Sequence, residues 1–402
     1  MFDVIVVGAG PAGAVAATVL ARRGVRVLML DRARFPRRKL CGDTLNPGAL
    51  AMLRRLGMTE GFEAGALKLD GMIVTGEHGV RVRSAYGPGL HALSIVRHVL
   101  DTALIGVATA AGARFEEGVL VRGTIVDETP VPRVRGIVMA GRDGGDVRVP
   151  APFVIAADGR RSALAVPLGL THQPKRPRRW AIGGYFAGVQ GLEPYGEMHV
   201  RRGRYIGVAP IPGALANVCL VVPEPRNMDD PGALLEDAVS RDPTLRDRFA
   251  GAALIDRPAV LGPLAVDARD AGMDGLLLAG DAAGFIDPMT GDGLRFAVRG
   301  GELAAQAVLS TMEGTVARPH VALRQQRERE FASKWRFNRT LRRLVAAPFT
   351  VEAAGAIAFA APALLRRTIQ FAGDVGVVSR DGAGAGEREG PPGGPRPGGR
   401  TR

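Results

Sequence analysis

The fold is decided near the start of the chain, by the stretch Phe2-Asp3-Val4-Ile5-Val6-Val7-Gly8-Ala9-Gly10-Pro11-Ala12-Gly13. The β-rich run before Gly8 predicts a buried strand, and the alanine-rich stretch from Ala14 to Arg23 predicts a helix that Gly24 ends. Val25 to Leu30 predicts a second buried strand, which closes at Asp31. The segment therefore predicts a βαβ unit with a parallel, right-handed crossover, and the fold class is α/β and Rossmann-like.

Each glycine of this turn has a use that a bound dinucleotide requires. Gly8 permits the tight turn, Gly10 lets a pyrophosphate approach the backbone, and Gly13 lets the helix pack closely on the strand. The helix N-terminus offers free N–H groups and a partial positive charge to the phosphates. Asp31 is placed to accept hydrogen bonds from both ribose hydroxyls and to repel a 2′-phosphate. The turn predicts an adenine dinucleotide site, for either FAD or NAD, and a glycine turn without a ligand is the alternative.

Composition places the chain among folded proteins that need neither a metal nor a disulfide framework. Its 402 residues are 46% hydrophobic and 23% charged, close to globular averages. The net charge of +13 would suit a polyanion, but it is carried almost entirely by arginine in a chain rich in Ala and Gly. Because coding bias explains that pattern equally well, we expect no nucleic-acid partner. Cys41 and Cys219 are far apart in the sequence, and no clustered Cys/His pattern predicts a metal site.

The sequence contains no segment that predicts secretion or a membrane span. The start of the chain lacks a basic region and a cleavage site. The longest uncharged apolar stretch, residues 353–365, contains Pro362 and is shorter than the about 20 residues that a bilayer requires. We therefore expect a cytoplasmic protein.

The order of predicted elements indicates a first domain that the chain leaves and re-enters. A polar, Pro-punctuated boundary at Thr171 to Arg179 precedes a strand-rich region that extends to Leu264, and a buried strand at 276–279 followed by a helix returns the chain to the first domain. We predict an FAD- or NAD-binding domain from 1–68, 92–175 and 265–325, and a mostly antiparallel substrate domain from 69–91 and 176–264. A helical C-terminal segment at 326–380 and a disordered tail at 381–402 complete the prediction.

Two distant segments discriminate between FAD and NAD. One is Ala157-Asp158-Gly159, and the other runs from Leu278 to Ala297 and begins Leu-Ala-Gly-Asp-Ala-Ala-Gly. With these segments the sequence resembles the flavoprotein monooxygenase superfamily of the para-hydroxybenzoate hydroxylase type, and most closely its geranylgeranyl reductase family, over roughly residues 1–325. The resemblance implies FAD, with Asp281 at the ribityl chain and the flavin ring at the helix that begins near Gly293. The expected cofactor-binding residues are Gly8, Gly10, Pro11, Ala12, Gly13, Asp31, Arg32, Cys41, Gly42, Arg97, Asp158, Gly159, Gly280, Asp281, Pro288, Gly291, Gly293 and Leu294.

The choice of family depends on the segment Phe35 to Asp43, which contains Lys39-Leu40-Cys41-Gly42. It resembles the Lys-x-Cys-Gly segment of the reductase family, whose cysteine lies beside the flavin ring. The resemblance therefore implies that Cys41 is close to the flavin and makes it the one candidate catalytic residue. The alternative is a small buried residue in a loop. Arg97 matches an arginine that opens a helix near the FAD phosphates in this superfamily, and a solvated helix arginine is its alternative.

Departures from the family pattern bear on the substrate. The aromatic substrate motif of the reductases is present here as Tyr205-Ile206-Gly207-Val208-Ala209-Pro210, with Gly207 and Ala209 where the family has Trp and Phe. We predict a substrate pocket at Tyr205, Gly207, Ala209 and Pro210 that is wider than in the family. A strand shifted in register is the alternative. The tryptophan motif of flavin halogenases is absent, which disfavours halogenation.

The predicted activity is that of an FAD-dependent oxidoreductase on an unsaturated or aromatic lipophilic small molecule, by hydride transfer. A monooxygenase that hydroxylates an aromatic, quinone-like or polyketide substrate is the alternative, and a non-catalytic flavin sensor is a remote one. Because no second dinucleotide fingerprint exists, NAD(P)H would bind transiently, or a reduced ferredoxin-like protein would replace it. Residues 344–365, between arginine pairs, either cap the substrate opening or contact the inner face of a membrane.

Overall fold

The computed structural model describes residues 1–346 and 361–375, apart from 78, 128, 129, 142, 177 and 225–227. The predicted tail at 381–402 and residues 347–360 and 376–380 of the predicted helical segment lie outside the described residues.

The βαβ unit is present as the first sequence segment predicts. Strand β1 (Val4–Val7) leads into helix α1 (Pro11–Ala21) and strand β2 (Val27–Asp31), and β2 pairs parallel to β1 with Val4 opposite Val27. These strands are the centre of a six-stranded sheet in the order β21-β22-β12-β1-β2-β8. The remaining strands are β8 (Arg114–Glu117), β12 (Phe153–Ala156), β21 (Gly272–Met273) and β22 (Leu276–Leu278), of which only β21 runs antiparallel. The α/β prediction is confirmed.

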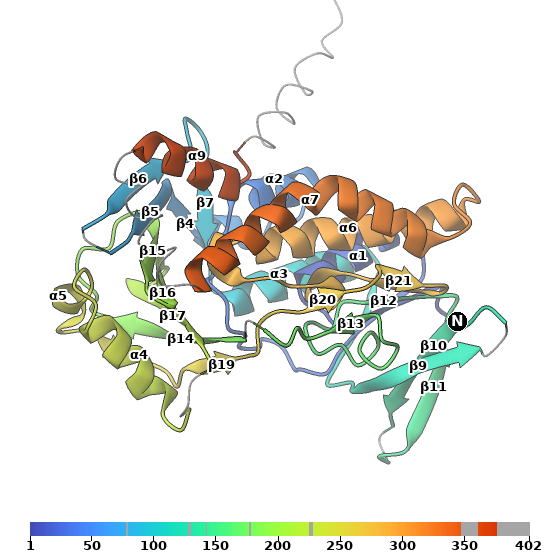
Figure 1. The fold of residues 1–402 in the computed structure, drawn as a ribbon. Coiled ribbons are helices and arrows are strands. Elements are labelled where there is room, and N and C mark those ends of the chain that lie inside the picture. The colour runs from blue at the N-terminus through green and yellow to red at the C-terminus, as the bar shows by residue number, and fades with distance from the viewer. Residues whose placement is uncertain are drawn as a thin grey trace, which may run out of the picture.

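Different elements cover the two faces of this sheet (Figure 1). Helices α1, α3 (Arg97–Ala110) and α6 (Gly293–Met312) pack on one face. The other face carries a meander of β9 (Val121–Asp127), β10 (Arg133–Ala140) and β11 (Asp146–Pro150), whose Val121, Val134 and Ile137 pack with buried residues of the sheet. Helices α1 and α6 approach so closely that a Cβ at Gly301 would lie 2.2 Å from the carbonyl oxygen of Ala12.

A second sheet of eight strands forms the other half of the molecule (Figure 1). Its strands are β5 (Gly71–Thr75), β6 (Arg81–Ala85), β14 (Arg179–Ala187), β15 (Tyr195–Arg201), β16 (Arg204–Ile211), β17 (Leu215–Pro223), β18 (Ala253–Leu254) and β19 (Ala259–Leu261). All pairs are antiparallel except β15 with β5. Helices α4 (Pro231–Ser240) and α5 (Arg246–Phe249) cover one face. The other face is turned toward the first sheet.

Short elements join the two halves. Strand β7 (Ala92–Ser94) pairs with β3 (Thr44–Leu45) and β4 (Leu67–Leu69), and β13 (Thr171–His172) pairs with β20 (Asp267–Ala268). Helix α2 (Pro47–Arg55) and the 3₁₀ turns η1 (Glu63–Gly65), η2 (Gly280–Ala283) and η3 (Pro288–Thr290) lie in these connections. At the C-terminal end, α7 (Pro319–Ala346) packs on α6, and α9 (Pro362–Ala372) lies against β6. None of the described helices has the length and apolarity needed to cross a membrane.

A buried polar network lies on the face of the second sheet that α4 and α5 cover. Arg248 donates two hydrogen bonds of 2.7 Å to the carboxylate of Glu197, and His199 Nε2 lies 3.0 Å from the same carboxylate. Arg201 makes a paired contact with Asp242 at 2.8 and 2.9 Å. Burial alone would raise the pKa of Glu197, but these hydrogen bonds and charges lower it to about 2.

The network predicts a specific loss of stability in acid. The pKa of Glu197 in the folded state lies below its value of 4.5 in the unfolded chain, so its contribution is complete at neutral pH and is lost as the pH falls from about 4.5 toward 2. At pH 3 the loss is about 2 kcal/mol in the free energy of unfolding. Urea titrations at pH 7 and pH 3 measure it. Glu197→Gln should lower the free energy of unfolding at pH 7 and reduce its difference between pH 7 and pH 3 by about 2 kcal/mol. An unchanged difference would show that Glu197 is not the group responsible.

Candidate active site

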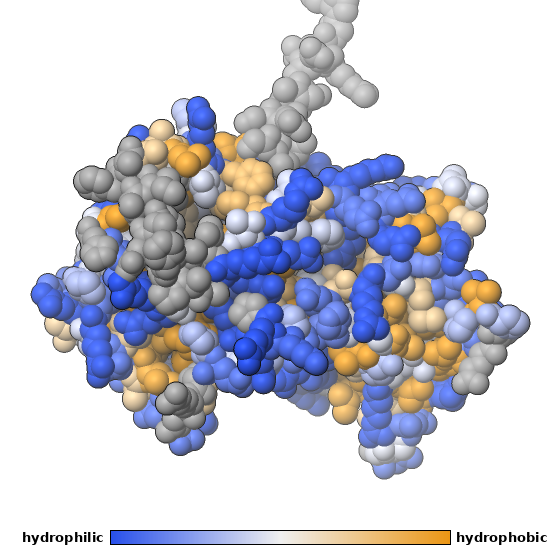
Figure 2. Space-filling view, in the orientation of Figure 1, coloured by the Kyte–Doolittle hydropathy of each residue, from blue (hydrophilic) through white to orange (hydrophobic). Residues whose placement is uncertain are grey.

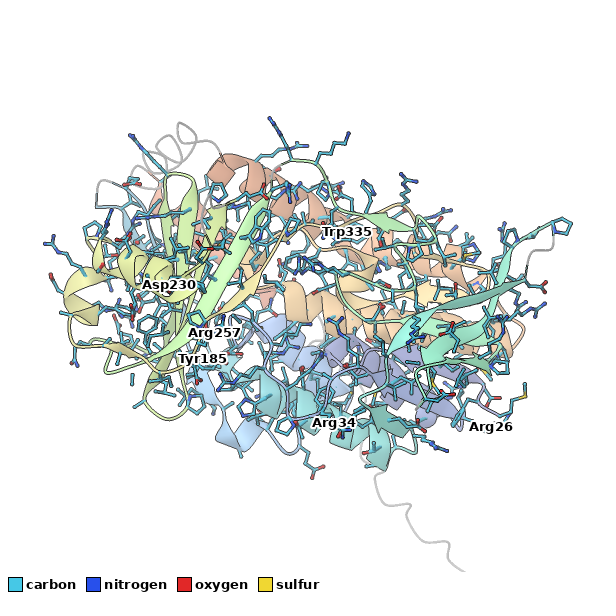
Figure 3. The ribbon with its side chains drawn as sticks, turned by 90° about the horizontal axis from the view of Figure 1, so that it is seen from below. Arg26, Arg34, Tyr185, Asp230, Arg257 and Trp335 are labelled. Carbon is cyan, nitrogen blue, oxygen red and sulfur yellow. The ribbon has the colours of Figure 1, made fainter. Side chains whose placement is uncertain are left out.

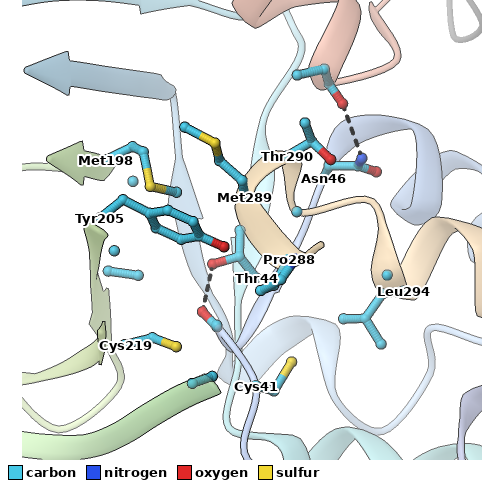
Figure 4. Close-up of a pocket in the computed structure, with 18 of the residues that line it drawn as sticks. Cys41, Thr44, Asn46, Met198, Tyr205, Cys219, Pro288, Met289, Thr290 and Leu294 are labelled. Atoms are coloured by element: carbon cyan, nitrogen blue, oxygen red, sulfur yellow. Dashed lines mark hydrogen bonds between the residues drawn. The ribbon is translucent and has the colours of Figure 1, made fainter. Parts of the chain in front are cut away.

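A cavity of about 410 Å³ lies between the two halves of the molecule. Its floor comes from the start of α1 and from the Cys41 loop, and one end lies at the beginning of α6. Strands β15, β16 and β17 of the second sheet form the opposite wall, with Met198, Tyr205 and Cys219 (Figure 4). The cavity therefore joins the predicted dinucleotide turn to the predicted substrate motif.

The glycines of the turn occupy the positions that their spacing predicts. Gly10, Pro11 and Ala12 line the cavity, whereas Gly8 and Gly13 pack behind it. Gly8 has φ +101°, and a Cβ at Gly13 would lie 1.8 Å from the carbonyl oxygen of Gly8. No side chain caps the N-terminus of α1. The free N–H groups of the helix therefore face the cavity, which is the arrangement that a phosphate requires.

Asp31 supports this turn from behind. Its carboxylate accepts hydrogen bonds of 2.8 Å from the backbone N–H groups of Ala9 and Ala33. Neither Asp31 nor Arg32 is among the residues that line the cavity, and Arg32 is exposed. The structure therefore shows Asp31 holding the turn, and its contact with a ribose stays a prediction.

Two residues beside the turn were not singled out from the sequence. Arg37 lies 3.6 Å from Asp31 and 3.5 Å from Asp101, and its guanidinium comes within 3.3 Å of the position of a Cβ on Gly10. Asp101 is fully buried and accepts a paired contact from Arg97 at 2.8 and 3.1 Å. The i, i+4 spacing of Arg97 and Asp101 on α3 was a signal for that ion pair. Nothing local indicated Arg37, whose partners are distant in the sequence.

Asp43 is a further residue that sequence reasoning missed, although it ends the segment Phe35 to Asp43. It is fully buried, with φ +50°. Its carboxylate accepts hydrogen bonds from Tyr185 Oη at 2.8 Å, from Asn217 Nδ2 at 2.5 Å and from the backbone N–H of Arg97 at 3.0 Å. Asn217 also donates to the Cys41 carbonyl at 2.8 Å. Asp43 therefore ties the Cys41 loop to α3 and to the second sheet.

Cys41 and Gly42 line the cavity, and so does the neighbouring Lys39. Burial raises the pKa of the Cys41 thiol, and the nearby Arg97 only partly offsets this. Burial, followed by the charge of Arg97, lowers the pKa of the Lys39 ammonium. Because the thiolate is the reactive form of a cysteine, these surroundings favour a packing role for Cys41 over a nucleophilic one.

The far end of the cavity lies at the start of α6. Gly280, Asp281, Pro288, Gly291, Gly293 and Leu294 line it, together with Gly159 and Arg97. Gly280 has φ +59°, and no side chain caps the N-terminus of α6. Asp158 does not line the cavity; its carboxylate accepts a hydrogen bond of 2.8 Å from Ala163 N, and burial raises its pKa.

The substrate motif lies on β16, in register with its neighbours. Tyr205, Gly207 and Ala209 line the cavity. Val208 also lines it, whereas Pro210 is not among the lining residues, so a place for Pro210 in the substrate pocket stays a prediction. The nearest atoms to a Cβ on Gly207 would be 3.9 Å away, an ordinary van der Waals contact, so a small side chain fits at this position without a clash. Tyr205 Oη donates a 2.6 Å hydrogen bond to Asp287, and its ring lies between Met198 and Met289 (Figure 4).

These features fit FAD. Two helix N-termini without side-chain caps open onto one elongated cavity, and each is preceded by a turn in which glycines keep the backbone accessible. A dinucleotide with phosphates at α1 and a polar ring edge at α6 satisfies both ends. Among the described residues, no group of His, Cys, Asp and Glu side chains is arranged to hold a metal ion.

Comparison with known proteins agrees with this geometry. Residues 1–334 match the family model described as FAD binding domain. The chain belongs to this FAD-binding family. It is 30% identical to a menaquinone reductase of Mycolicibacterium smegmatis, over 93% of this chain and 91% of the relative.

Two further relatives of this flavoprotein carry different activities. A digeranylgeranylglycerophospholipid reductase of Methanopyrus kandleri is 32% identical, over 78% of this chain and 81% of the relative. The crystal structure of CmlS, a flavin-dependent halogenase, has a TM-score of 0.74 at 26% identity, covering 83% of this chain but only 62% of the halogenase. The two reductases confirm the predicted resemblance to the geranylgeranyl reductase family. This chain is an FAD-dependent oxidoreductase or monooxygenase.

The C-terminal helix of the flavoprotein supplies the last wall of the cavity. Thr368, Ile369, Ala372 and Gly373 line it. Lys334 is buried and anchors the end of α9, since its ammonium donates to the Ala372 carbonyl at 2.9 Å and lies 3.2 Å from Asp374. The same ammonium contacts Asp292, the N-cap residue of α6, at 3.1 Å. One lysine therefore links the cavity wall to the helix at the predicted flavin ring.

Proposed function

We propose that this flavoprotein is a reductase that transfers a hydride to a carbon–carbon double bond or a quinone-like ring of a lipophilic small molecule. The carrying observation is the apolar wall opposite the Cys41 loop, where Gly207 leaves open space beside Met198, Tyr205 and Met289. The names of the two reductase relatives support the same class of substrate. Bound FAD would supply the hydride.

The chain's own residues would position and shield the reactants. The free N–H groups at the start of α1 would hold the pyrophosphate, and Gly280 with Asp281 would hold the ribityl chain. The N-terminus of α6 favours negative charge at the ring, which stabilises the reduced state. The wall that α9 contributes would exclude water from the substrate. A ring-bearing substrate would stack where Gly207 and Ala209 leave room.

The monooxygenase alternative is supported by the halogenase whose structure this chain resembles. Anaerobic reduction followed by exposure to oxygen separates the two. Under the reductase proposal the oxidised absorbance returns in one rapid phase without modification of the substrate. A slow return in two phases, with oxygen incorporated into an aromatic substrate, would favour the monooxygenase. NAD(P)H bleaching the flavin without any substrate conversion would favour the sensor.

The purified protein is expected to be yellow, with one FAD per chain. The two uncapped helix ends and the glycine turn face a single cavity, so one elongated dinucleotide occupies both. Absorbance after heat release, with separation of the released nucleotide, gives the stoichiometry. Extraction of NAD, or no chromophore after reconstitution with FAD, would contradict the assignment.

We also propose that α9 delivers the substrate from a membrane surface. One side of α9 lines the cavity, while its outer side exposes Leu364, Phe371, Arg366 and Arg367. Apolar and basic side chains on one helical face are the combination that binds anionic lipid. We expect flotation with anionic liposomes at low salt, and weaker flotation in Leu364→Glu, whose parent side chain is 56% exposed. Phe371 is left unchanged because its ring packs on Phe337 and Lys334. If the wild-type protein remained at the bottom of the gradient, the membrane role would be rejected and α9 would only cap the cavity.

A further inference from the structure

A second, smaller cavity of about 130 Å³ lies behind the flavin-binding segment. Its inner wall is the segment Ala283 to Ile286, and Phe285 lines both this cavity and the large one. Its outer walls are α7 and the strip from Val266 to Ala271. A single stretch of chain therefore separates the predicted flavin site from an opening on another side of the molecule.

Arg327 forms part of this wall and carries an unbalanced charge. It is 8% exposed, and it donates to the carbonyls of Ala283 at 2.7 Å and Leu278 at 3.4 Å. Among the described residues no carboxylate lies within ion-pair distance of it, and burial lowers its pKa to about 10. Its guanidinium lies 5.6 Å from the ring centroid of Trp335, which also lines the cavity. Asp267, Asp270 and Glu328 also line the cavity, and Asp270 pairs with Arg324 at 2.9 Å, so four arginines stand against three carboxylates in the lining.

Exposed basic residues surround the opening. On α7, Arg336 and Arg343 lie three and four residues from Arg339, so all three share one side of the helix. Arg269 is exposed beside them, on the strip that lines the cavity. This basic face consists of Arg269, Arg336, Arg339 and Arg343.

The character of the basic face indicates which partner it suits. None of the exposed large hydrophobic side chains of the described residues belongs to it, and the strip over α7 is mostly hydrophilic (Figure 2). Figure 3 labels Trp335, with side chains ending in nitrogen along the edge of the molecule beyond it. A membrane surface is better matched by α9, which exposes apolar residues, and a cavity of about 130 Å³ is too small for a whole dinucleotide. A folded partner with an acidic surface suits a basic, polar face.

We propose that the basic face docks an acidic electron-carrier protein, such as a reduced ferredoxin, which supplies the electrons for the proposed reduction of the lipophilic substrate. The inference rests on that function. Two reduced carriers are oxidised by one electron each, the bound flavin gains the two electrons, and solvent supplies the protons. Phe285 lines both cavities and Trp335 lines the smaller one, so the path from the docked carrier to the flavin would pass these two rings.

The test uses the FAD-loaded protein and an acidic ferredoxin. Calorimetric titration with oxidised ferredoxin gives the Kd over a salt series, and anaerobic mixing with reduced ferredoxin gives the rate of flavin bleaching. Arg339→Glu should weaken binding and slow bleaching at least about fivefold at low salt. The control is Arg148→Glu, an equally exposed arginine on β11 with the same change in net charge, which should change neither quantity beyond about twofold.

Each outcome decides the proposal. Equal effects of the two variants, or an affinity independent of salt, would overturn it. Bleaching of the flavin by NAD(P)H, with no binding of ferredoxin, would also overturn the proposal. So would a result in which Arg339→Glu abolishes binding to vesicles but leaves the rate of flavin reduction by ferredoxin unchanged. Reduction by dithionite followed by addition of substrate tests the reductase function separately. Dithionite-reduced protein that fails to convert substrate, yet binds ferredoxin through Arg339, would refute the proposed function alone.

Discussion

Gly13→Ala is expected to abolish FAD retention and to destabilise the whole protein. The new methyl group would lie 1.8 Å from the carbonyl oxygen of Gly8 and 3.2 Å from Val6, so α1 must move away from β1. Both are backbone or core atoms that cannot rotate aside. Overpacking of a core costs about 1–3 kcal/mol, and the shortness of this contact places the cost near the upper end. A lower melting temperature and a colourless preparation are the measurements.

Gly10→Ala is the matched control in the same turn. A Cβ there meets only the terminal nitrogen of Arg37, at 3.3 Å, and a flexible side chain can yield. We expect normal folding but a weaker affinity for FAD, because the methyl group stands where the pyrophosphate approaches the backbone. If both variants retained FAD like the parent protein, the turn would not be the phosphate site.

Gly207→Trp is expected to lower the turnover rate of a bulky substrate at least about a hundredfold, while FAD binding and folding persist. The Cβ position is open, so an indole would extend into the cavity beside Met198 and fill the space that the substrate needs. Steady-state kinetics, FAD affinity and the melting temperature are measured on the same preparation.

Gly207→Ala serves as the control, since a single methyl group meets no atom closer than 3.9 Å. It should retain most of the activity. Equal loss of FAD, solubility and activity in the Trp variant would show that the position is structural. Unchanged kinetics with the bulky substrate would place the substrate elsewhere in the cavity.

The parts of the molecule that were predictable from sequence are those that local chemistry determines. The βαβ unit follows from a β-branched run, a glycine turn and an alanine-rich helix, all within contiguous residues. The expectation that Gly207 faces the substrate came from the resemblance of Tyr205 to Pro210 to the reductase motif, and Gly207 does line the cavity.

The missed residues depend on contacts between distant segments. Asp43 owes its role to Tyr185 and Asn217, on strands of the second sheet. Arg37 is held by Asp31 and Asp101. A single sequence carries no local pattern for such pairs, because neither partner differs from an ordinary loop residue until the sheets are assembled. The division into domains stays a prediction of the same kind.

The position of α9 has a consequence for how the cofactor enters and leaves its site. Thr368, Ile369, Ala372 and Gly373 form one wall of the cavity, and Lys334 holds the end of the helix that carries them. Detachment of α9 from Lys334 would remove that wall and expose the predicted FAD site along its length. The rate at which bound FAD exchanges with free FAD would therefore be set by how often the contacts of Lys334 break.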